Sequence, residues 1–169
     1  MGYVLNFNGV DSKIDCGVPD TLVGDISIST WVKPYSYGEG NAGHIISTHA
    51  DGINLFITTS DNKVSFSKDG GGHTASAANN TIILSKWMHI IVTSVADGTS
   101  NIYLNGILSG SADQAAGTLG ETVDLLIGNR SAEDRTFDGL INDVCIYSGI
   151  LTANEANQAY TESKARYGQ

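Results

Sequence analysis

The sequence predicts an all-β fold: an antiparallel β-sandwich that ends with one short helix. Short apolar runs recur along the 169 residues with Gly, Asn and Asp between them, and helix-like periodicity is confined to the end of the chain. Strands at this spacing, separated by turn residues, are typical of sandwiches and barrels. We expect a single domain over residues 1–169, since a chain of this length builds one full core.

The predicted strands follow one another from the first residues to Tyr147. Alternation is clearest in 26–33, where Ile26 and Ile28 share one face while Ser27 and Ser29 share the other. A strand that is polar on one face predicts a sheet that is only half buried. The predicted strands are 3–8, 13–16, 26–33, 44–48, 54–59, 63–67, 81–84, 87–94, 99–104, 125–128 and 139–147.

Turn residues separate these strands. The pairs at 61–62, 97–98 and 105–106 combine Asn, Asp and Gly, which tolerate the positive φ angles of tight hairpins. Two stretches, 34–43 and 68–80, read as long loops, and 109–121 reads as a flap or a weak edge strand.

One helix is predicted near the end of the chain. Thr152 and Glu155 have the spacing of a capping box, in which each side chain satisfies a backbone N–H of the other residue. We expect the helix to run from about residue 153 to residue 160 or beyond, with Ala156, Ala159 and Tyr160 on its inward face.

Charge and hydropathy exclude some partners. The formal net charge is −9, with 9 basic residues against 18 acidic ones, so the chain lacks the clustered cations that bind nucleic acid. No run approaches the roughly 18 apolar residues that cross a bilayer, so no membrane insertion is expected. Residues 1–20 show no signal peptide, so either one was removed or none existed.

Five segments carry a family resemblance: 7–14, 28–33, 86–93, 102–107 and 137–156. In order and spacing they resemble the laminin G-like family of concanavalin A-like jelly rolls, across nearly the whole chain. The resemblance implies a jelly-roll sandwich that acts as a non-catalytic binding or structural module. It also implies an extracellular, cell-surface or virion location.

Two functional hypotheses follow from the resemblance. The first is carbohydrate or glycoconjugate binding through loops at the rim of the sandwich. The alternative is a structural assembly protein, such as a virion decoration or fibre subunit, that contacts a partner protein or further copies of itself as a homo-oligomer. The expected partner is therefore a glycan or a protein.

An enzyme is not expected. Some relatives of this fold are glucanases with acidic residues at Glu-x-Asp-x-Glu spacing on one strand, and this chain has no such spacing. Its histidines stand outside any recognisable catalytic motif. His89 lies in a segment that resembles the family's Trp-His-His-Val-Ala strand, which implies a structural role.

Two loops supply candidate ligand-binding residues. Tyr35 and Tyr37 flank one serine in a Gly-rich loop, where both rings would serve as stacking platforms for sugars or would anchor the loop instead. Asn129 and Arg130 belong to a second polar loop, whose charges would recognise a polar ligand or pair with one another.

A structural calcium ion is the candidate cofactor. Asn8 and Asp11 follow the first strand and Asp143 lies on the last strand, which the family fold places near the first. Three oxygen-bearing side chains would then converge, with carbonyls and water completing the six to eight ligands that calcium takes. The alternative is that Asn8 and Asp11 only build the turn.

The two cysteines, Cys16 and Cys145, fall in strands near the two ends of the chain. A disulfide is geometrically allowed if those strands are neighbours. Two free, partly buried thiols are the favoured interpretation, because Cys often acts as a small core residue.

Overall fold

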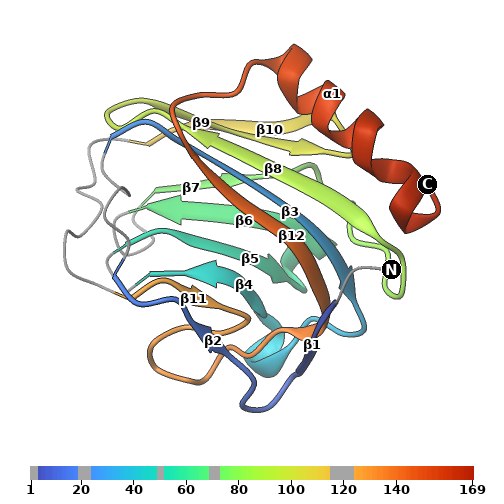
Figure 1. Ribbon diagram of the computed structural model, residues 1–169. Coiled ribbons are helices and arrows are strands. Elements are labelled where there is room, and N and C mark those ends of the chain that lie inside the picture. The colour runs from blue at the N-terminus through green and yellow to red at the C-terminus, as the bar shows by residue number, and fades with distance from the viewer. Residues whose placement is uncertain (1–3, 19–23, 49–51, 69–72, 115–123) are drawn as a thin grey trace.

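The computed structural model describes residues 4–18, 24–48, 52–68, 73–114 and 124–169. These residues form two antiparallel sheets of six strands each, stacked face to face, with one α-helix lying across the outer face of one sheet (Figure 1). The predicted all-β sandwich with a short helix near its C-terminal end is confirmed.

Sheet A contains the strands nearest the helix. In spatial order they are β1 (Leu5–Asn8), β12 (Asp138–Ser148), β3 (Ile26–Pro34), β8 (Met88–Ser94), β9 (Thr99–Leu104) and β10 (Ile107–Asp113). Sheet B contains, also in spatial order, β2 (Ile14–Asp15), β11 (Leu126–Ile127), β4 (His44–Ser47), β5 (Asn54–Thr58), β6 (Lys63–Lys68) and β7 (His73–Ser76).

Short helical turns join some of these elements. The 3-10 turn η1 (Glu39–Asn41) lies in the loop after β3, and η2 (Ser60–Asn62) makes the turn between β5 and β6. The α-helix α1 (Ala153–Ser163) continues directly into a last 3-10 turn, η4 (Lys164–Tyr167).

The main core fills the space between the sheets. Sheet A contributes fully buried side chains such as Ile28 and Ile90, and sheet B contributes Leu55, Ile57 and Phe66. Removing such side chains from water is the dominant stabilising contribution to a fold of this size.

The outer face of β3 differs from the prediction. Ser27, Ser29 and Trp31 point away from the core as the alternation predicts, yet all three are buried. The expected half-buried sheet is therefore wrong for this strand. The physical reason is α1, which covers this face of sheet A (Figure 1).

The structure corrects two predicted segments. Residues 81–84 form no strand: Ile82 packs into the core, but Ile83 is exposed. The long loop predicted at 68–80 contains β7, which pairs with β6. For 109–121, the predicted alternative of an edge strand is confirmed as far as residue 113, because β10 is the last strand of sheet A and pairs with β9 across a tight turn at 105–106. Residues 115–121 lie outside the described residues.

The predicted capping box starts α1. Thr152 accepts a hydrogen bond from the backbone N–H of Glu155 at 3.3 Å, and a carboxylate oxygen of Glu155 accepts one from the backbone N–H of Thr152 at 2.7 Å. These contacts satisfy two backbone donors that a helix start leaves unpaired. The helix then presents Ala156, Ala159 and Tyr160 to sheet A, as predicted.

Replacing Thr152 by Ala should destabilise the domain by about 1 kcal/mol, because the helix start loses its side-chain acceptor. Urea unfolding followed by far-UV circular dichroism measures the change. Thr152→Ser is the matched control, since it keeps the hydroxyl and should cost much less. Equal losses in the two variants would contradict a capping role.

Candidate functional site

The helix docks on sheet A through a second, smaller apolar cluster. Ile91 and Tyr103 from the sheet pack against Ala156, with Leu151 and Ala159 beside them. A small residue such as Ala156 lets the helix backbone approach the sheet closely. This docking fixes the position of every α1 side chain over the sheet.

An aromatic stack lies next to this cluster. The Trp31 ring is parallel to the His89 ring at 4.9 Å and to the Tyr167 ring at 4.1 Å between centroids. The indole N–H of Trp31 donates to the hydroxyl of Ser163 at 3.0 Å, and Tyr160 stacks at the edge of the group at 5.9 Å. Offset stacking of this kind contributes stability beyond area burial.

A groove of about 570 Å³ opens beside the stack, between α1 and β12. Ser29 and His89 line its base. Cys145 and Tyr147 from β12 line one side, and Glu162 and Arg166 line the other. We call this the α1 groove; its volume lies within the range of small-molecule sites.

Asp143 enters the groove because β12 is irregular at this point. The register of β12 against β3 shifts between Asn142 and Cys145, and Asp143 itself has a φ of 47°. A bulge of this kind redirects a side chain, and Asp tolerates the left-handed region better than most residues.

The Asp143 carboxylate is only partly satisfied. Its Oδ2 atom lies 3.0 Å from a guanidinium nitrogen of Arg166, without the alignment of a hydrogen bond, and this buried oxygen has no hydrogen-bond partner. An unsatisfied buried acceptor is costly, so it favours a donor that arrives with a ligand.

His89 is neutral at physiological pH. Burial lowers its pKa to about 4, and the nearby Asp143 carboxylate opposes the shift only weakly. Its Nε2 atom lies 2.9 Å from the hydroxyl oxygen of Ser29, and its Nδ1 atom is buried without a hydrogen-bond partner.

The contact between Ser29 and His89 has the geometry of a nucleophile and a base. A catalytic histidine of that kind is oriented by a third group on its other ring nitrogen, and the Nδ1 atom of His89 has no such partner.

A second cavity, of about 350 Å³, lies by the start of β8. Thr81, Trp87, Asn105 and Gln169 contribute to its lining. The hydroxyl oxygen of Thr81 is buried there without a hydrogen-bond partner. Its lining therefore combines one aromatic ring with neutral polar groups and one cation, Lys86.

The structure separates the two tyrosines that were predicted to act together. Tyr35 is 43% exposed, with the ammonium of Lys33 5.9 Å from the centre of its ring. Tyr37 packs against the main core instead. The predicted pair of outward-facing rings is wrong for Tyr37, which anchors its loop.

Asn129 is also structural. It is fully buried, its amide donates to the hydroxyl of Thr136 at 2.8 Å, and its carbonyl oxygen accepts from the backbone N–H groups of Arg130 and Arg135. Contact with a ligand would require this network to open. Asn129 therefore holds the loop in shape and offers no unpaired polar group to a ligand.

Arg130 lies at the surface of the same loop. Its guanidinium donates to both carboxylate oxygens of Asp134, and this pairing lowers the pKa of Asp134 to about 2. The loop meets the Tyr37 loop where Glu39 accepts hydrogen bonds from Thr136. The two predicted loops therefore lie side by side, but their polar side chains mostly pair with one another.

The predicted calcium ligands do not converge. Asn8 and Asp11 hydrogen-bond to each other at 2.8 Å, and the carbonyl oxygen of Asn8 accepts from three backbone N–H groups of the turn. Asn8 pairs with Asp138 in the sheet, five residues from Asp143. The residues present therefore build a turn and do not fit the predicted three-residue metal site.

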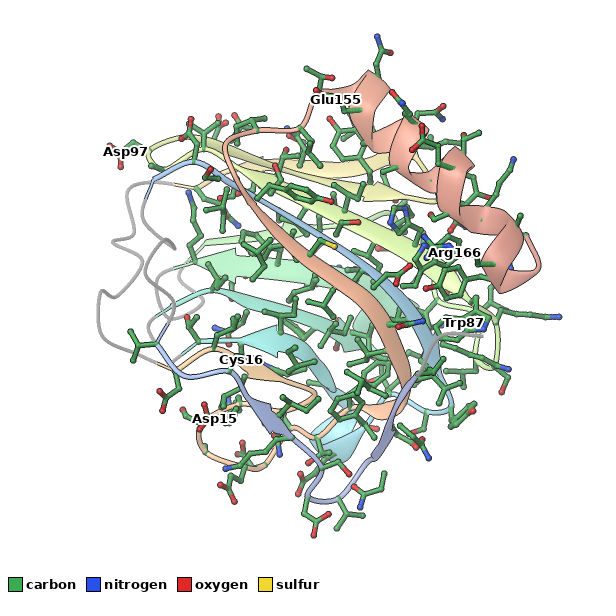
Figure 2. The ribbon with its side chains drawn as sticks, viewed as in Figure 1. Asp15, Cys16, Trp87, Asp97, Glu155 and Arg166 are labelled. Carbon is green, nitrogen blue, oxygen red and sulfur yellow. The ribbon has the colours of Figure 1, made fainter. Side chains whose placement is uncertain are left out.

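The cysteines are free, as predicted, but both are exposed, which corrects the expectation of partial burial. Cys16 follows β2 in sheet B (Figure 2), whereas Cys145 is part of β12 in sheet A. The two strands are not neighbours. Cys145 instead lines the α1 groove.

Sequence reasoning missed most of the groove. It gave Asp143 as a site residue, but with the wrong neighbours, and it did not give Tyr147, Glu162 or Arg166 as site residues. One available signal was the large Trp31 on the otherwise polar face of its strand, which indicates a covering element.

Two six-stranded antiparallel sheets packed face to face define a jelly-roll domain of the lectin-like class. The chain belongs to the concanavalin A-like lectin/glucanases superfamily, because a laminin G model of that superfamily matches residues 8–157.

One curated relative is adhesion G-protein coupled receptor V1 of Danio rerio, which is 24% identical over 174 residues. The match covers 92% of this chain and 3% of the receptor. The chain therefore corresponds to one small part of that relative.

Solved structures share the fold. A heptameric SAP-like pentraxin from Limulus polyphemus superposes with a TM-score of 0.66 at 16% identity, over 90% of this chain and 83% of the pentraxin. The binding domain of botulinum neurotoxin serotype G superposes with a TM-score of 0.71 at 24% identity, over 96% of this chain and 42% of the neurotoxin domain. The binding domain of neurotoxin DC, solved in complex with SialylT, superposes with a TM-score of 0.70 at 15% identity, over 95% of this chain and 45% of that domain. This chain spans less than half of either neurotoxin domain.

Among the described residues, no helix has the length and apolar character required to cross a membrane.

Proposed function

We propose that this domain is a non-catalytic glycan-binding module and that the α1 groove is its sugar site. The observation that carries the proposal is the composition of the groove: an exposed aromatic ring, Tyr147, lies on the same strand as the Asp143 carboxylate, whose buried Oδ2 atom forms an ion pair with Arg166 but no hydrogen bond. Sugars present apolar ring faces and hydroxyl donors together, so they match both features.

The remaining groove residues fit the same chemistry. Arg166 supplies donors and Glu162 supplies acceptors at the open side, while the neutral His89 presents a polar ring at the base. Partial burial and the neighbouring Cys145 raise the pKa of Tyr147, so its phenol stays protonated and keeps a hydroxyl donor. Paired donors and acceptors around one ring are how proteins bind hydroxyl-rich ligands.

Comparisons give general support. One structural neighbour was solved in complex with SialylT, and the curated relative is an adhesion receptor. An extracellular or cell-surface location is part of this proposal. Calcium is not required by the groove, so binding is expected to be the same with calcium and with a chelator.

Tyr147→Ala should weaken glycan binding at least about tenfold, because the stacking platform is lost. A glycan array selects ligands for the wild-type chain, and isothermal titration calorimetry measures their affinities. Tyr147→Phe keeps the ring and should retain most of the binding.

The matched control is Tyr35→Ala, since Tyr35 is 43% exposed and Tyr147 is 41% exposed. Tyr35 belongs to the rim loop that the sequence favoured. Loss of binding in Tyr35→Ala, with binding retained in Tyr147→Ala, would show that the sugar site lies at that rim. Absence of binding to any array glycan would overturn the glycan proposal.

A second function has one observation in its favour. Ile107 and Leu108 are 69% and 54% exposed on β10, the last strand of sheet A. Exposed apolar side chains on an edge strand favour self-association, as in an assembly subunit. Light scattering on the purified chain tests this, with a monomer as the result against it.

A further inference from the structure

The Tyr167 side chain lies between the two tryptophans of the protein. Its ring is parallel to Trp31 at 4.1 Å, with an interplanar angle of 14°, and meets Trp87 edge-on at 4.8 Å and 62°. Trp31 is 1% exposed, although it points away from the main core. Tyr167 thus covers an indole face that would otherwise be open on the outer side of sheet A.

Tyr167 also lies between the two cavities. Its neighbour Arg166 lines the α1 groove together with Trp31, whereas Gln169 lines the second cavity together with Trp87. Figure 2 shows Arg166 and Trp87 on the same side of the sandwich, at the end of the helix. The Tyr167 ring therefore contacts one lining residue of each cavity, Trp31 and Trp87.

Asp143 anchors the turn that holds Tyr167 in place. The Arg166 guanidinium lies 3.0 Å from its carboxylate. The pKa of Tyr167 is raised first by burial and then by hydrogen bonding to Asp143. A sugar hydroxyl that donates to Asp143 in the groove competes with both contacts, so binding there weakens the anchor of the Tyr167 ring.

We propose that Trp31 and Trp87 form a second sugar-stacking position, which the Tyr167 ring fills in this structure and which a linear β-1,4-linked oligosaccharide takes over. The proposal deepens the glycan function and rests on it. Equatorial β-1,4 links keep successive sugar rings in a flat ribbon, so their apolar faces are available to aromatic rings at separate positions.

The spacing favours an oligosaccharide over a single sugar. Tyr147 pairs with Ser27 in the sheet, and Trp31 is four residues further along β3. At about 3.3 Å per residue this is roughly 13 Å along the strand. A chain of a few sugars spans such a distance from Tyr147 to the tryptophans, and a monosaccharide does not.

The test compares Tyr167→Ala with the wild-type chain by titration calorimetry, using chitotriose and cellotriose with N-acetylglucosamine and glucose as single-sugar probes. If the site is open in only a small fraction of the molecules, its apparent affinity is the affinity of the open site multiplied by that fraction. Tyr167→Ala should therefore bind a trisaccharide about tenfold more tightly, with a much smaller gain for single sugars, which lose only the competing Tyr167 contact at Asp143. Tyr160→Ala is the control, because it removes another ring stacked on Trp31 and leaves Tyr167 in place.

Trisaccharide binding that stays the same in Tyr167→Ala, while Tyr147→Ala still weakens it, would overturn this inference and leave the glycan function standing. No trisaccharide binding by either chain overturns this inference, and no binding to any array glycan overturns the proposed function as well. Near-UV circular dichroism confirms that each variant keeps its packing.

A second measurement avoids any change to Tyr167. Trp87→Phe leaves Trp31 as the sole tryptophan, because the chain has two. Replacement of the phenol by a sugar should shift the Trp31 emission when chitotriose or cellotriose is added. Emission that stays constant at saturating trisaccharide would contradict displacement of Tyr167.

Discussion

Acidification from pH 7 to pH 4.5 is expected to lower the free energy of unfolding of this domain by about 5 kcal/mol, with the loss beginning near pH 6.5. Two buried histidines, His44 and His89, cause it. Each has a pKa of about 4 in the folded protein, against 6.5 for an unperturbed imidazole. Domains of this size are stable by only about 5–15 kcal/mol, so two such groups matter.

Each shift has a physical cause. His44 is 6% exposed, and its pKa is lowered first by burial and then by the positive charges of Arg130 and Arg135. It stacks on Phe56 at 5.2 Å. His89 is 3% exposed, and its pKa is lowered by burial beneath α1.

The direction of the stability change follows from proton uptake by the unfolded chain. As the pH falls below 6.5 the unfolded chain binds protons at these imidazoles, whereas the folded protein does not until about pH 4. Unfolding is therefore favoured progressively across this window. At about 1.4 kcal/mol per pH unit, each histidine accounts for about 3 kcal/mol when the window is crossed.

Urea unfolding at a series of pH values from 7.5 to 4.5 measures this. His44→Gln and His89→Gln should each be less stable than wild type at pH 7.5 but lose about half as much on acidification. The Asp134 carboxylate titrates near pH 2, below the window, so it does not obscure the result. A double variant with the wild-type pH profile would show that other groups cause the loss.

Local sequence signals predicted most of the fold correctly. The alternation in 26–33 and the capping box at Thr152 each determine structure within a few residues, so neighbouring residues suffice to identify them. The hairpin at Asn105 is of the same kind, since its φ of 49° is one that Asn tolerates.

Segments that depend on distant contacts were harder. Strand β10 contains Ser, Gly and Ala, which have little strand preference, and it forms because it pairs with β9 and packs against β7. Conversely, residues 81–84 carry a strand-like run, but Ile82 alone enters the core and Ile83 is left in solvent.

The α1 groove depends on distant contacts even more than these segments do. Ser29, Tyr147 and Arg166 come from three distant segments, and only the docking of α1 brings them together. The calcium prediction failed on register: β1 does pair with β12 as expected, but Asn8 lies opposite Asp138. A shift of a few residues in pairing moves a side chain to a different site.

Gly128→Ala should destabilise the domain by about 2–5 kcal/mol, because two costs combine. Gly128 has a φ of 85°, and a side chain in the left-handed region costs about 1–2 kcal/mol. An added Cβ would also lie 1.9 Å from the Phe7 ring. Overpacking of a core typically costs another 1–3 kcal/mol.

The Phe7 ring has little room to move away. It is 3% exposed and meets Phe137 edge-on at 6.5 Å between centroids, in the main core. The backbone at Gly128 is fixed as well, since its N–H donates to Ile45 and its carbonyl accepts from Phe137. The clash is therefore resolved only by displacing core side chains or by breaking these hydrogen bonds.

Gly17→Ala separates the two costs. Gly17 has a similar φ of 68°, but a Cβ there would meet no atom within 4 Å, so only the backbone cost of about 1–2 kcal/mol remains. Urea unfolding of both variants gives the difference, which is the cost of the clash. Phe7→Leu in the Gly128→Ala background should recover part of it, since the smaller side chain frees space beside the new methyl group. Equal losses at the two glycines would mean that the core yields freely around Phe7, and the close packing of β11 against the first strand would then contribute little to the stability of the sandwich.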